Sequence, residues 1–232
     1  MKELFHKYIN IFFHPFISHD ELRQKRNNMD HGHVLSMVGG TEFSRGTVVL
    51  DEAESGEVTF TEALGVSWVF MMIKTVYSFF FIHIGIHFFS YLGEHAEFKK
   101  IILPGIQVGS QKLSLFIILL EVALFPVFVW IYVKFWSVII RFFTNLFETP
   151  NSEEGLRQVV NYSLSSHFFY LIPIFGELGK HVSSLFLIFA GLKKNLGFNN
   201  LQSLLVIISP LILFMISALM VFLTFMVMIG LF

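Results

Sequence analysis

Long apolar runs, separated by short segments that hold most of the charge, dominate the chain from Ala63 to Phe232. The runs 63–92 and 113–143 each exceed the ~20 residues that a helix needs to cross a ~30 Å hydrocarbon core. The last run, 201–232, contains no charged residue. This pattern predicts an all-α membrane protein.

Capping and turn signals divide residues 59–232 into predicted helices. The capping box Thr59–Glu62 starts the first span, which Gly93 ends. Pro173–Gly176 forms a tight turn between the third and fourth helices, and Pro210 interrupts the last. The predicted spans are 63–92, 113–143, 153–172, 177–193 and 201–231. We expect a five-span transmembrane helical bundle, although the third and fourth helices could instead form a re-entrant pair.

The region 1–58 is polar and begins with a predicted amphipathic helix that ends at Pro15. The spacing of its apolar residues places them on one helical face. These residues are Phe5, Ile9, Phe12, Phe13 and Phe16. Such a helix can lie in the membrane interface, with Phe5, Phe12, Phe13 and Phe16 as anchors. It can also pack on the protein's own bundle, and both arrangements can hold together.

A second, polar helix is predicted to start at the capping box Ser18–Glu21. Its basic residues Arg23, Lys25 and Arg26 form a solvated face, or they contact anionic headgroups. Residues 27–56 are predicted to form a loop in which His31 and His33 are ordinary surface residues. A small hairpin between 47–50 and 58–60 is a further expectation there.

Composition supports the membrane class. Apolar residues make up 54% of the chain and charged residues only 14%, against about 25% charged in typical soluble domains. The net charge of −1 gives no indication of nucleic-acid binding. The chain has no cysteine, which excludes disulfides, thiolate zinc sites and a cysteine nucleophile.

Lysine and arginine outside the predicted spans are distributed unevenly. With five spans and an internal N-terminus, ten of these residues lie inside and four outside. Cytoplasmic loops carry the excess of basic residues in membrane proteins. We therefore expect the N-terminus inside the cell and the C-terminus outside.

Ionisable residues within the spans are functional candidates, because placing them in lipid is costly. They are Lys74, His83, His87, Glu121 and Lys134. His83 and His87 share one helical face, but two histidines make a poor zinc site, so no metal site is predicted. Counting from the span centres places Glu121 level with His83, and a hydrogen bond from Glu121 to His83 or His87 is expected. The same counting places Lys74 and Lys134 in the inner half, where they repel.

His167 and His181 lie near the turn between the third and fourth predicted helices. We expect them to form hydrogen bonds between helices rather than to act in catalysis. The chain contains no Ser-His-Asp order, phosphate-binding glycine loop or zincin motif. An enzymatic activity and a cofactor are therefore not predicted.

Four short motifs follow one another in the second half of the chain. They are Tyr162-Ser163, Ile172-Pro173 with Gly176, Gly191-Leu192-Lys193-Lys194 and Ser209-Pro210. In order and spacing they resemble the Yip family of Ypt/Rab-interacting membrane proteins, with Tyr162, Pro173, Gly176 and Gly191 as the motif residues. Phe13-His14-Pro15-Phe16 is similar to the pre-membrane segment of the bacterial branch.

Two departures from the Yip pattern are visible. Ser165-Ser166-His167 stands where members usually have a proline, and the Asp-Leu-Tyr-Gly-Pro signature of eukaryotic members is absent. The resemblance is therefore to the bacterial-type branch and does not imply Rab binding. It implies five spans, a cytoplasmic N-terminus and a location in the bacterial cytoplasmic (inner) membrane.

Two functions remain open. The resemblance implies a non-enzymatic adaptor or organiser, whose partners are membrane lipids and other membrane proteins or a second copy of the chain. The alternative is a transporter or an ion- or proton-conducting subunit that uses His83, His87 and Glu121. The sequence contains no internal repeat, which disfavours the transporter, since many transporter folds are duplicated.

Overall fold

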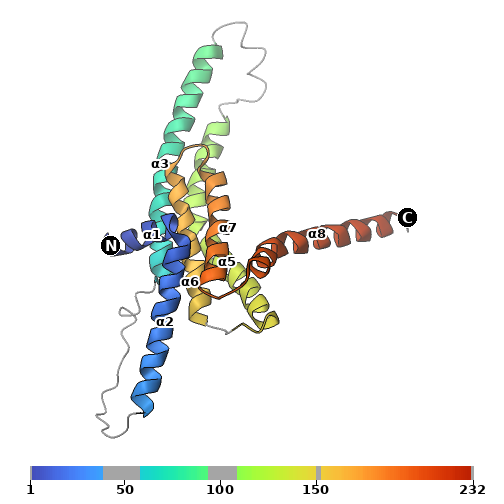
Figure 1. Cartoon of the computed structure of the whole chain (residues 1–232). Helices are drawn as coiled ribbons and strands as arrows, with labels where there is room; N and C mark the ends of the chain where they lie inside the picture. The colour runs from blue at the N-terminus through green and yellow to red at the C-terminus, as the bar shows by residue number, and fades with distance from the viewer. Residues whose placement is uncertain (1, 39–57, 94–108, 150–152, 231–232) are drawn as a thin grey trace. The chain divides into compact units, whose positions relative to one another are not determined.

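The computed structural model describes residues 2–38, 58–93, 109–149 and 153–230, and their regular secondary structure is entirely helical (Figure 1). This confirms the predicted all-α class, while residues 47–50 of the predicted hairpin lie outside the described residues. In chain order the elements are α1 (Lys2–Phe13), α2 (Pro15–Val38), α3 (Phe60–Gly93), α5 (Gly109–Leu146), α6 (Glu153–Ser163), the 3₁₀ helix η1 (Leu164–Leu171), α7 (Gly176–Lys194) and α8 (Asn200–Gly230).

Three of the described helices are long and apolar enough to cross a membrane. Their apolar segments are Phe60–Gly85 in α3, Phe116–Leu146 in α5 and Asn200–Gly230 in α8. They correspond to the first, second and fifth predicted spans. The five-span count stays a prediction, because α6, η1 and α7 are shorter or more polar.

The start of α3 confirms the predicted capping box. The Thr59 backbone N–H donates to Glu62 Oε2 at 2.9 Å, and the Glu62 N–H donates to Thr59 Oγ1 at 3.3 Å. These bonds satisfy two donors that the first helical turn leaves without a partner. The described part of α3 runs to Gly93, and the predicted helix end there stays a prediction because residues 94–108 lie outside the described residues.

The predicted start of the second helix was wrong. The α2 helix begins at Pro15, and the Ser18 N–H donates to the His14 carbonyl at 3.0 Å. Ser18 therefore lies inside the first turn and does not cap it, because proline is well suited to the first helical position. The helix continues to Val38, so residues 27–38, with His31 and His33, are helical and not a loop.

The third predicted helix changes its geometry partway. It is α-helical to Ser163 and continues as the 3₁₀ helix η1 to Leu171. A 3₁₀ run of eight residues is long, because such runs seldom exceed three or four. The predicted turn follows, where the Phe175 N–H donates to the Pro173 carbonyl at 2.7 Å and Ile174 has a φ of 69°.

The predicted interruption at Pro210 was wrong, since α8 is continuous from Asn200 to Gly230. Proline has no N–H to donate to the carbonyl four residues earlier, which here belongs to Val206. The Ser209 hydroxyl donates to that carbonyl at 2.7 Å and takes the place of the missing donor. From residue 211 to 230 every side chain of α8 is exposed within the described chain.

The chain divides into two compact units that do not follow its linear order. Unit 1 consists of Met1–Ile9, Val58–Phe135 and Asn161–Ser184. Unit 2 consists of Asn10–Glu57, Trp136–Val160 and Leu185–Phe232. Each unit thus combines residues from both sides of the boundary predicted between residues 58 and 59.

In unit 1, the start of α1 packs on other helices of that unit. Tyr8 is buried and its ring lies 6.3 Å from the ring of Tyr162. Phe5, a predicted interfacial anchor, lies 6.2 Å from Phe70 of α3 but keeps 44% of its surface exposed. Part of the aromatic face of α1 therefore packs on the protein's own helices, which is one of the two predicted arrangements. Membrane contact by Phe5 stays a prediction.

In unit 2, the other predicted anchors differ in their surroundings. Phe13 is 60% exposed, and Phe12 contacts it edge-on at 5.2 Å. Phe16 lies in α2 and packs edge-on against Phe186 of α7 at 5.6 Å. Phe16 thus packs against the protein itself, while membrane contact by Phe13 stays a prediction.

A buried polar network in unit 2 corrects the prediction for Arg26. Its guanidinium donates to Asn195 Oδ1 at 2.7 Å and to the Asn195 carbonyl at 3.1 Å. Asn195 in turn donates to Gln158 Oε1 at 2.9 Å. Arg26 therefore joins α2 to the end of α7 and is not part of a solvated face. His19 nearby is buried, and this burial lowers its pKa to about 4, so it is neutral at pH 7.

Candidate functional site

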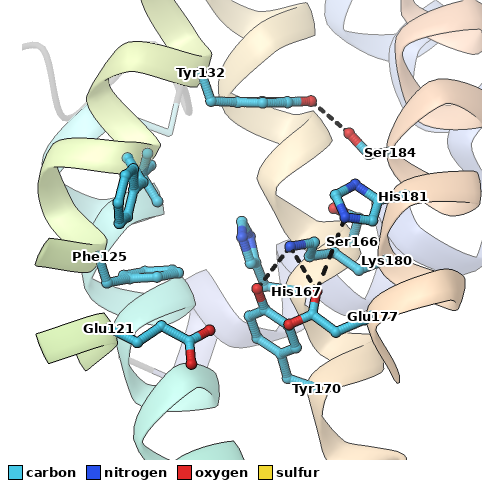
Figure 2. A pocket seen from close by; sticks show the side chains of 12 residues that line it. Glu121, Phe125, Tyr132, Ser166, His167, Tyr170, Glu177, Lys180, His181 and Ser184 are labelled. Atoms are coloured by element: carbon cyan, nitrogen blue, oxygen red, sulfur yellow. Dashed lines mark hydrogen bonds and ion pairs between the residues drawn. The ribbon is translucent and has the colours of Figure 1, made fainter. Parts of the chain in front are cut away.

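Unit 1 contains a pocket of about 370 Å³ between α5, η1 and α7 (Figure 2). One part of its wall is aromatic and apolar, and the rest carries hydroxyl, imidazole, carboxylate and ammonium groups. The lining residues are Glu121, Phe125, Phe128, Val129, Tyr132, Ser166, His167, Tyr170, Glu177, Lys180, His181 and Ser184. Ionisable groups are costly to place within a membrane and are functional candidates where they occur, so this pocket is the candidate site.

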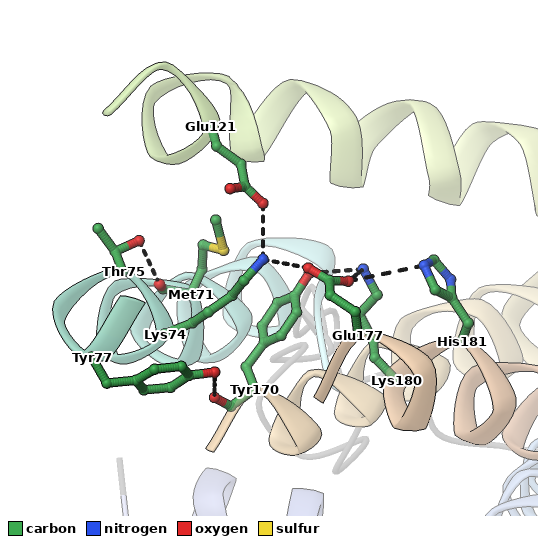
Figure 3. Close-up of polar contacts among 9 residues, drawn as sticks. All are labelled: Met71, Lys74, Thr75, Tyr77, Glu121, Tyr170, Glu177, Lys180 and His181. Carbon is green, nitrogen blue, oxygen red and sulfur yellow. Dashed lines mark hydrogen bonds and ion pairs between the residues drawn. The ribbon is translucent and has the colours of Figure 1, made fainter. Parts of the chain in front are cut away.

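A lysine from α3 joins the two carboxylates of this pocket (Figure 3). Lys74 Nζ lies 2.9 Å from Glu121 Oε1 of α5 and also pairs with Glu177 Oε1 of α7. The Lys74 side chain is 15% exposed, whereas those of Glu121 and Glu177 are 42% and 45% exposed. One ammonium group thus connects three helices.

The second carboxylate oxygen of Glu177 contacts basic groups of its own helix. Lys180 Nζ lies 3.0 Å from Glu177 Oε2, and His181 Nε2 lies 3.9 Å from it. These three residues share one face of α7, since positions three and four apart are neighbours on a helix. Lys180 also donates to the Tyr170 hydroxyl at 2.7 Å. The two lysines, Lys74 and Lys180, balance the two glutamates in formal charge.

The other end of the pocket is uncharged. The Tyr132 hydroxyl of α5 contacts Ser163 Oγ at 3.0 Å and also bonds to Ser184 Oγ of α7. Ser166 is buried and makes no hydrogen bond with the described residues. The pocket therefore has a charged end and a hydroxyl-lined end.

His167 of η1 lies between these two ends and has a defined tautomer. Its Nδ1 atom lies 2.7 Å from the Leu164 carbonyl oxygen. Because a carbonyl oxygen can only accept, Nδ1 carries the hydrogen in the neutral imidazole, and Nε2 keeps a free lone pair. The ring packs edge-on against Phe125 at 5.4 Å. His167 is 8% exposed, so this lone pair belongs to a nearly buried side chain.

The predicted hydrogen bond from Glu121 to His83 or His87 was wrong. Glu121 pairs with Lys74 instead, and both histidines are exposed. Their rings contact each other at 4.8 Å, and His83 stacks on Phe79 at 6.3 Å. Counting from span centres compares only depth in the membrane, whereas the pairing also depends on the register and rotation at which α3 and α5 pack, and this packing brings Glu121 to Lys74.

The pairing of Lys74 also overturns the expected repulsion between Lys74 and Lys134. Lys74 is paired with two carboxylates, while Lys134 is exposed and forms no ion pair with the described residues. Of the predicted candidates, the structure therefore gathers Lys74, Glu121 and His167 at the pocket. It does not bring His83, His87 or Lys134 to it.

Within the described residues, His167 and His181 do not form the interhelical hydrogen bonds that were expected. His167 bonds to a carbonyl three residues earlier in its own helix, and His181 contacts Glu177 four residues earlier. In both cases the nearest partner lies within the same element, because one helical turn brings positions three and four apart together.

Sequence reasoning missed Glu177, Lys180 and Tyr170 as site residues. Glu177 and Lys180 stand at the start of α7, next to the turn, and the sequence analysis assigned them no functional role. The signal that could have identified them is the spacing of Glu177, Lys180 and His181, which places an acid and two bases on one helical face. A tyrosine in an apolar run gives no comparable signal.

The four residues of the Yip-like motifs have structural positions in the described chain. Tyr162 is buried against Tyr8, and Pro173 lies in the turn before α7. A Cβ atom on Gly176 would lie 2.5 Å from the Phe169 carbonyl oxygen, and one on Gly191 would lie 2.8 Å from the Val159 methyl groups. Close packing explains why these positions are glycine.

Comparison with known proteins does not show which family this chain belongs to. No family model matches the chain, and neither a curated protein nor a solved structure matches it significantly. The resemblance to the Yip family therefore stays a prediction from its motifs. Among the described residues, no group of three or more His, Asp or Glu side chains is placed to hold a metal ion.

Proposed function

We propose that this chain is a multi-pass membrane protein of the transporter or ion-conducting class, and that the pocket of unit 1 is its site. One observation carries the proposal. Lys74, Glu121, Glu177 and Lys180, from three helices, form a charge-balanced network beside a 370 Å³ cavity. The residues differ from those in the sequence-based alternative, because His83 and His87 lie outside the network.

The cost of this network favours a functional role. An ionised residue at the centre of a membrane helix costs roughly 2.5–3.5 kcal/mol on the insertion scale. One ion pair is enough to lock two helices, and apolar residues of similar size often lock them as well or better. Here two further lysine–glutamate pairs and a cavity accompany the first pair, as expected of a site that admits an ion or a polar solute.

The proposal is tested by ion flux into liposomes that contain the purified protein. The variant Glu121→Gln keeps the shape of the side chain but removes the charge that faces the cavity. We expect it to lose ion uptake while eluting as a single, folded species. Lys134→Gln is the matched control, since it also removes one charge from α5 but lies outside the pocket. Equal uptake by the wild-type protein and Glu121→Gln would contradict the proposal.

A second candidate function is the adaptor or organiser that the Yip resemblance implies. It is favoured by α8, in which residues 211–230 are all exposed within the described chain and none is charged. Such a helix is stable only against lipid or the helices of another membrane protein. Because the chain has no cysteine, Ser217→Cys gives a single cross-linking site in α8. An adaptor should cross-link to a defined neighbour and should keep that neighbour in Glu121→Gln.

We further propose five spans, with the N-terminus inside the cell and the C-terminus outside. At ~1.5 Å per α-helical residue and ~2.0 Å per 3₁₀ residue, α6 and η1 together measure about 32 Å, and α7 about 28 Å. Both lengths are close to the thickness of the hydrocarbon core. The distribution of basic residues supports this orientation. A reporter that is active only outside the cytoplasm, fused after Phe232, should be active, and activity of a cytoplasm-only reporter there would contradict five spans.

A further inference from the structure

We infer that the ion handled by the pocket is the proton, and that it is accepted by Glu121 Oε2 and His167 Nε2. The inference rests on the proposed function and specifies its substrate. It also assigns a role in proton transfer to His167, which the sequence predicted only to form hydrogen bonds between helices.

The first acceptor is the free oxygen of Glu121. Glu121 Oε1 pairs with Lys74, whereas Glu121 Oε2 forms no hydrogen bond with the described residues. The side chain is 42% exposed and lines the cavity, as Figure 2 shows. A hydronium ion that enters the cavity can therefore give up a proton, which forms an O–H bond at Oε2 and leaves a neutral water molecule. Lys74 then keeps its pair with Glu177, so it is not left without a counter-charge.

The second acceptor is Nε2 of His167. The bond from Nδ1–H to the Leu164 carbonyl holds the ring in one tautomer and leaves the Nε2 lone pair available. His167 lines the same cavity as Glu121. With about 30 Å³ for each water molecule, the cavity has room for several, and its hydroxyl and carboxylate groups supply their partners. In the transfer, the O–H bond of Glu121 breaks, its electron pair stays on Oε2, and the proton passes through water to form an N–H bond at Nε2.

The charged groups around the two acceptors suit a proton better than a metal ion. Lys74 faces the site from α3, and Glu177, Lys180 and His181 face it from α7. Glu177 is already paired with two lysines, so it is not available as a ligand. A hard cation such as Mg²⁺ or Ca²⁺ needs six or more oxygen ligands. A proton needs only one lone pair, and the pocket offers two on Glu121 and His167.

The experiment compares proton and sodium uptake by liposomes that contain the full chain. A pH-sensitive dye inside reports protons under an imposed pH gradient, and a sodium-sensitive dye reports sodium in separate vesicles. His167→Asn keeps an N–H near the position of Nδ1 but has no atom in place of Nε2. We expect it to slow proton uptake by about tenfold or more. His83→Asn removes an exposed histidine outside the pocket and should leave uptake unchanged.

Protonation of Glu121 is measured independently of flux. On acidification, infrared difference spectra of the wild-type protein should show the carbonyl band of a protonated carboxylic acid, and Glu121→Gln should lack it. If His167→Asn does not fold, His167→Gln replaces it, and this infrared band still tests Glu121.

The outcomes separate this inference from the proposed function. Sodium uptake that requires Glu121, without proton uptake, would support the proposed function but contradict the inference that the transported ion is a proton. Unchanged proton uptake by the His167 variants would contradict the assignment of His167 as a proton acceptor. Absence of any uptake by the wild-type protein would overturn both the inference and the proposed function.

Discussion

Replacing Lys74 with Met is expected to lower the free energy of unfolding by about 2–4 kcal/mol, because it leaves Glu121 without a cation and leaves Glu177 with Lys180 alone. Lys74 is the only group that pairs with Glu121 within the described residues, and it also pairs with Glu177. Thermal unfolding of the purified protein in mild detergent measures the change. Lys134→Met is the matched control, since Lys134 is exposed and forms no ion pair with the described residues.

The double variant Lys74→Met, Glu121→Gln separates the ion pair from simple loss of packing. It removes the charge that Lys74→Met leaves unpaired, so we expect it to recover a substantial part of the lost stability. A change below about 0.5 kcal/mol in Lys74→Met would show instead that the network behaves like an exposed surface pair. The same double variant should also lose ion uptake, because it removes the free oxygen of Glu121.

Adding one methyl group at Gly176 is expected to destabilise unit 1 by roughly 1–3 kcal/mol, the usual cost of overpacking. A Cβ atom there would lie 2.5 Å from the Phe169 carbonyl oxygen and 3.5 Å from Tyr170 Cα. Both atoms belong to the backbone of η1, which cannot rotate away as a side chain does. The expected shift of η1 moves Tyr170 and His167, so Gly176→Ala should also reduce ion uptake.

Gly65→Ala is the control for this variant, because a Cβ atom at Gly65 of α3 meets no atom within 4 Å. Alanine favours a helix over glycine by about 1 kcal/mol, so this variant should be as stable as the wild-type protein or slightly more stable. Equal unfolding temperatures for Gly176→Ala and Gly65→Ala would contradict the close packing of η1 against α7.

Local features of the chain could be predicted from the sequence. The start of α3 depends on Thr59 and Glu62, which lie three positions apart. The turn at Pro173–Gly176 is likewise formed by neighbouring residues. Caps and turns involve groups within one helical turn of each other, so the residues that form them can be identified without the rest of the fold. The length and apolar character of three helices follow from composition in the same way.

The composition of the site was decided by the tertiary structure. Lys74 and Glu121 lie 47 positions apart, and Lys74 and Glu177 lie 103 apart. Which of these side chains come into contact depends on the axial register at which α3 packs on α5 and α7. A continuous apolar surface packs almost equally well at several registers, so counting from span centres could not choose among them. Residues 164–171 also form a 3₁₀ helix in the folded protein, and His167 of this helix lines the cavity. The ionisable residues can be identified in the sequence, but which of them form ion pairs is determined by how the helices pack.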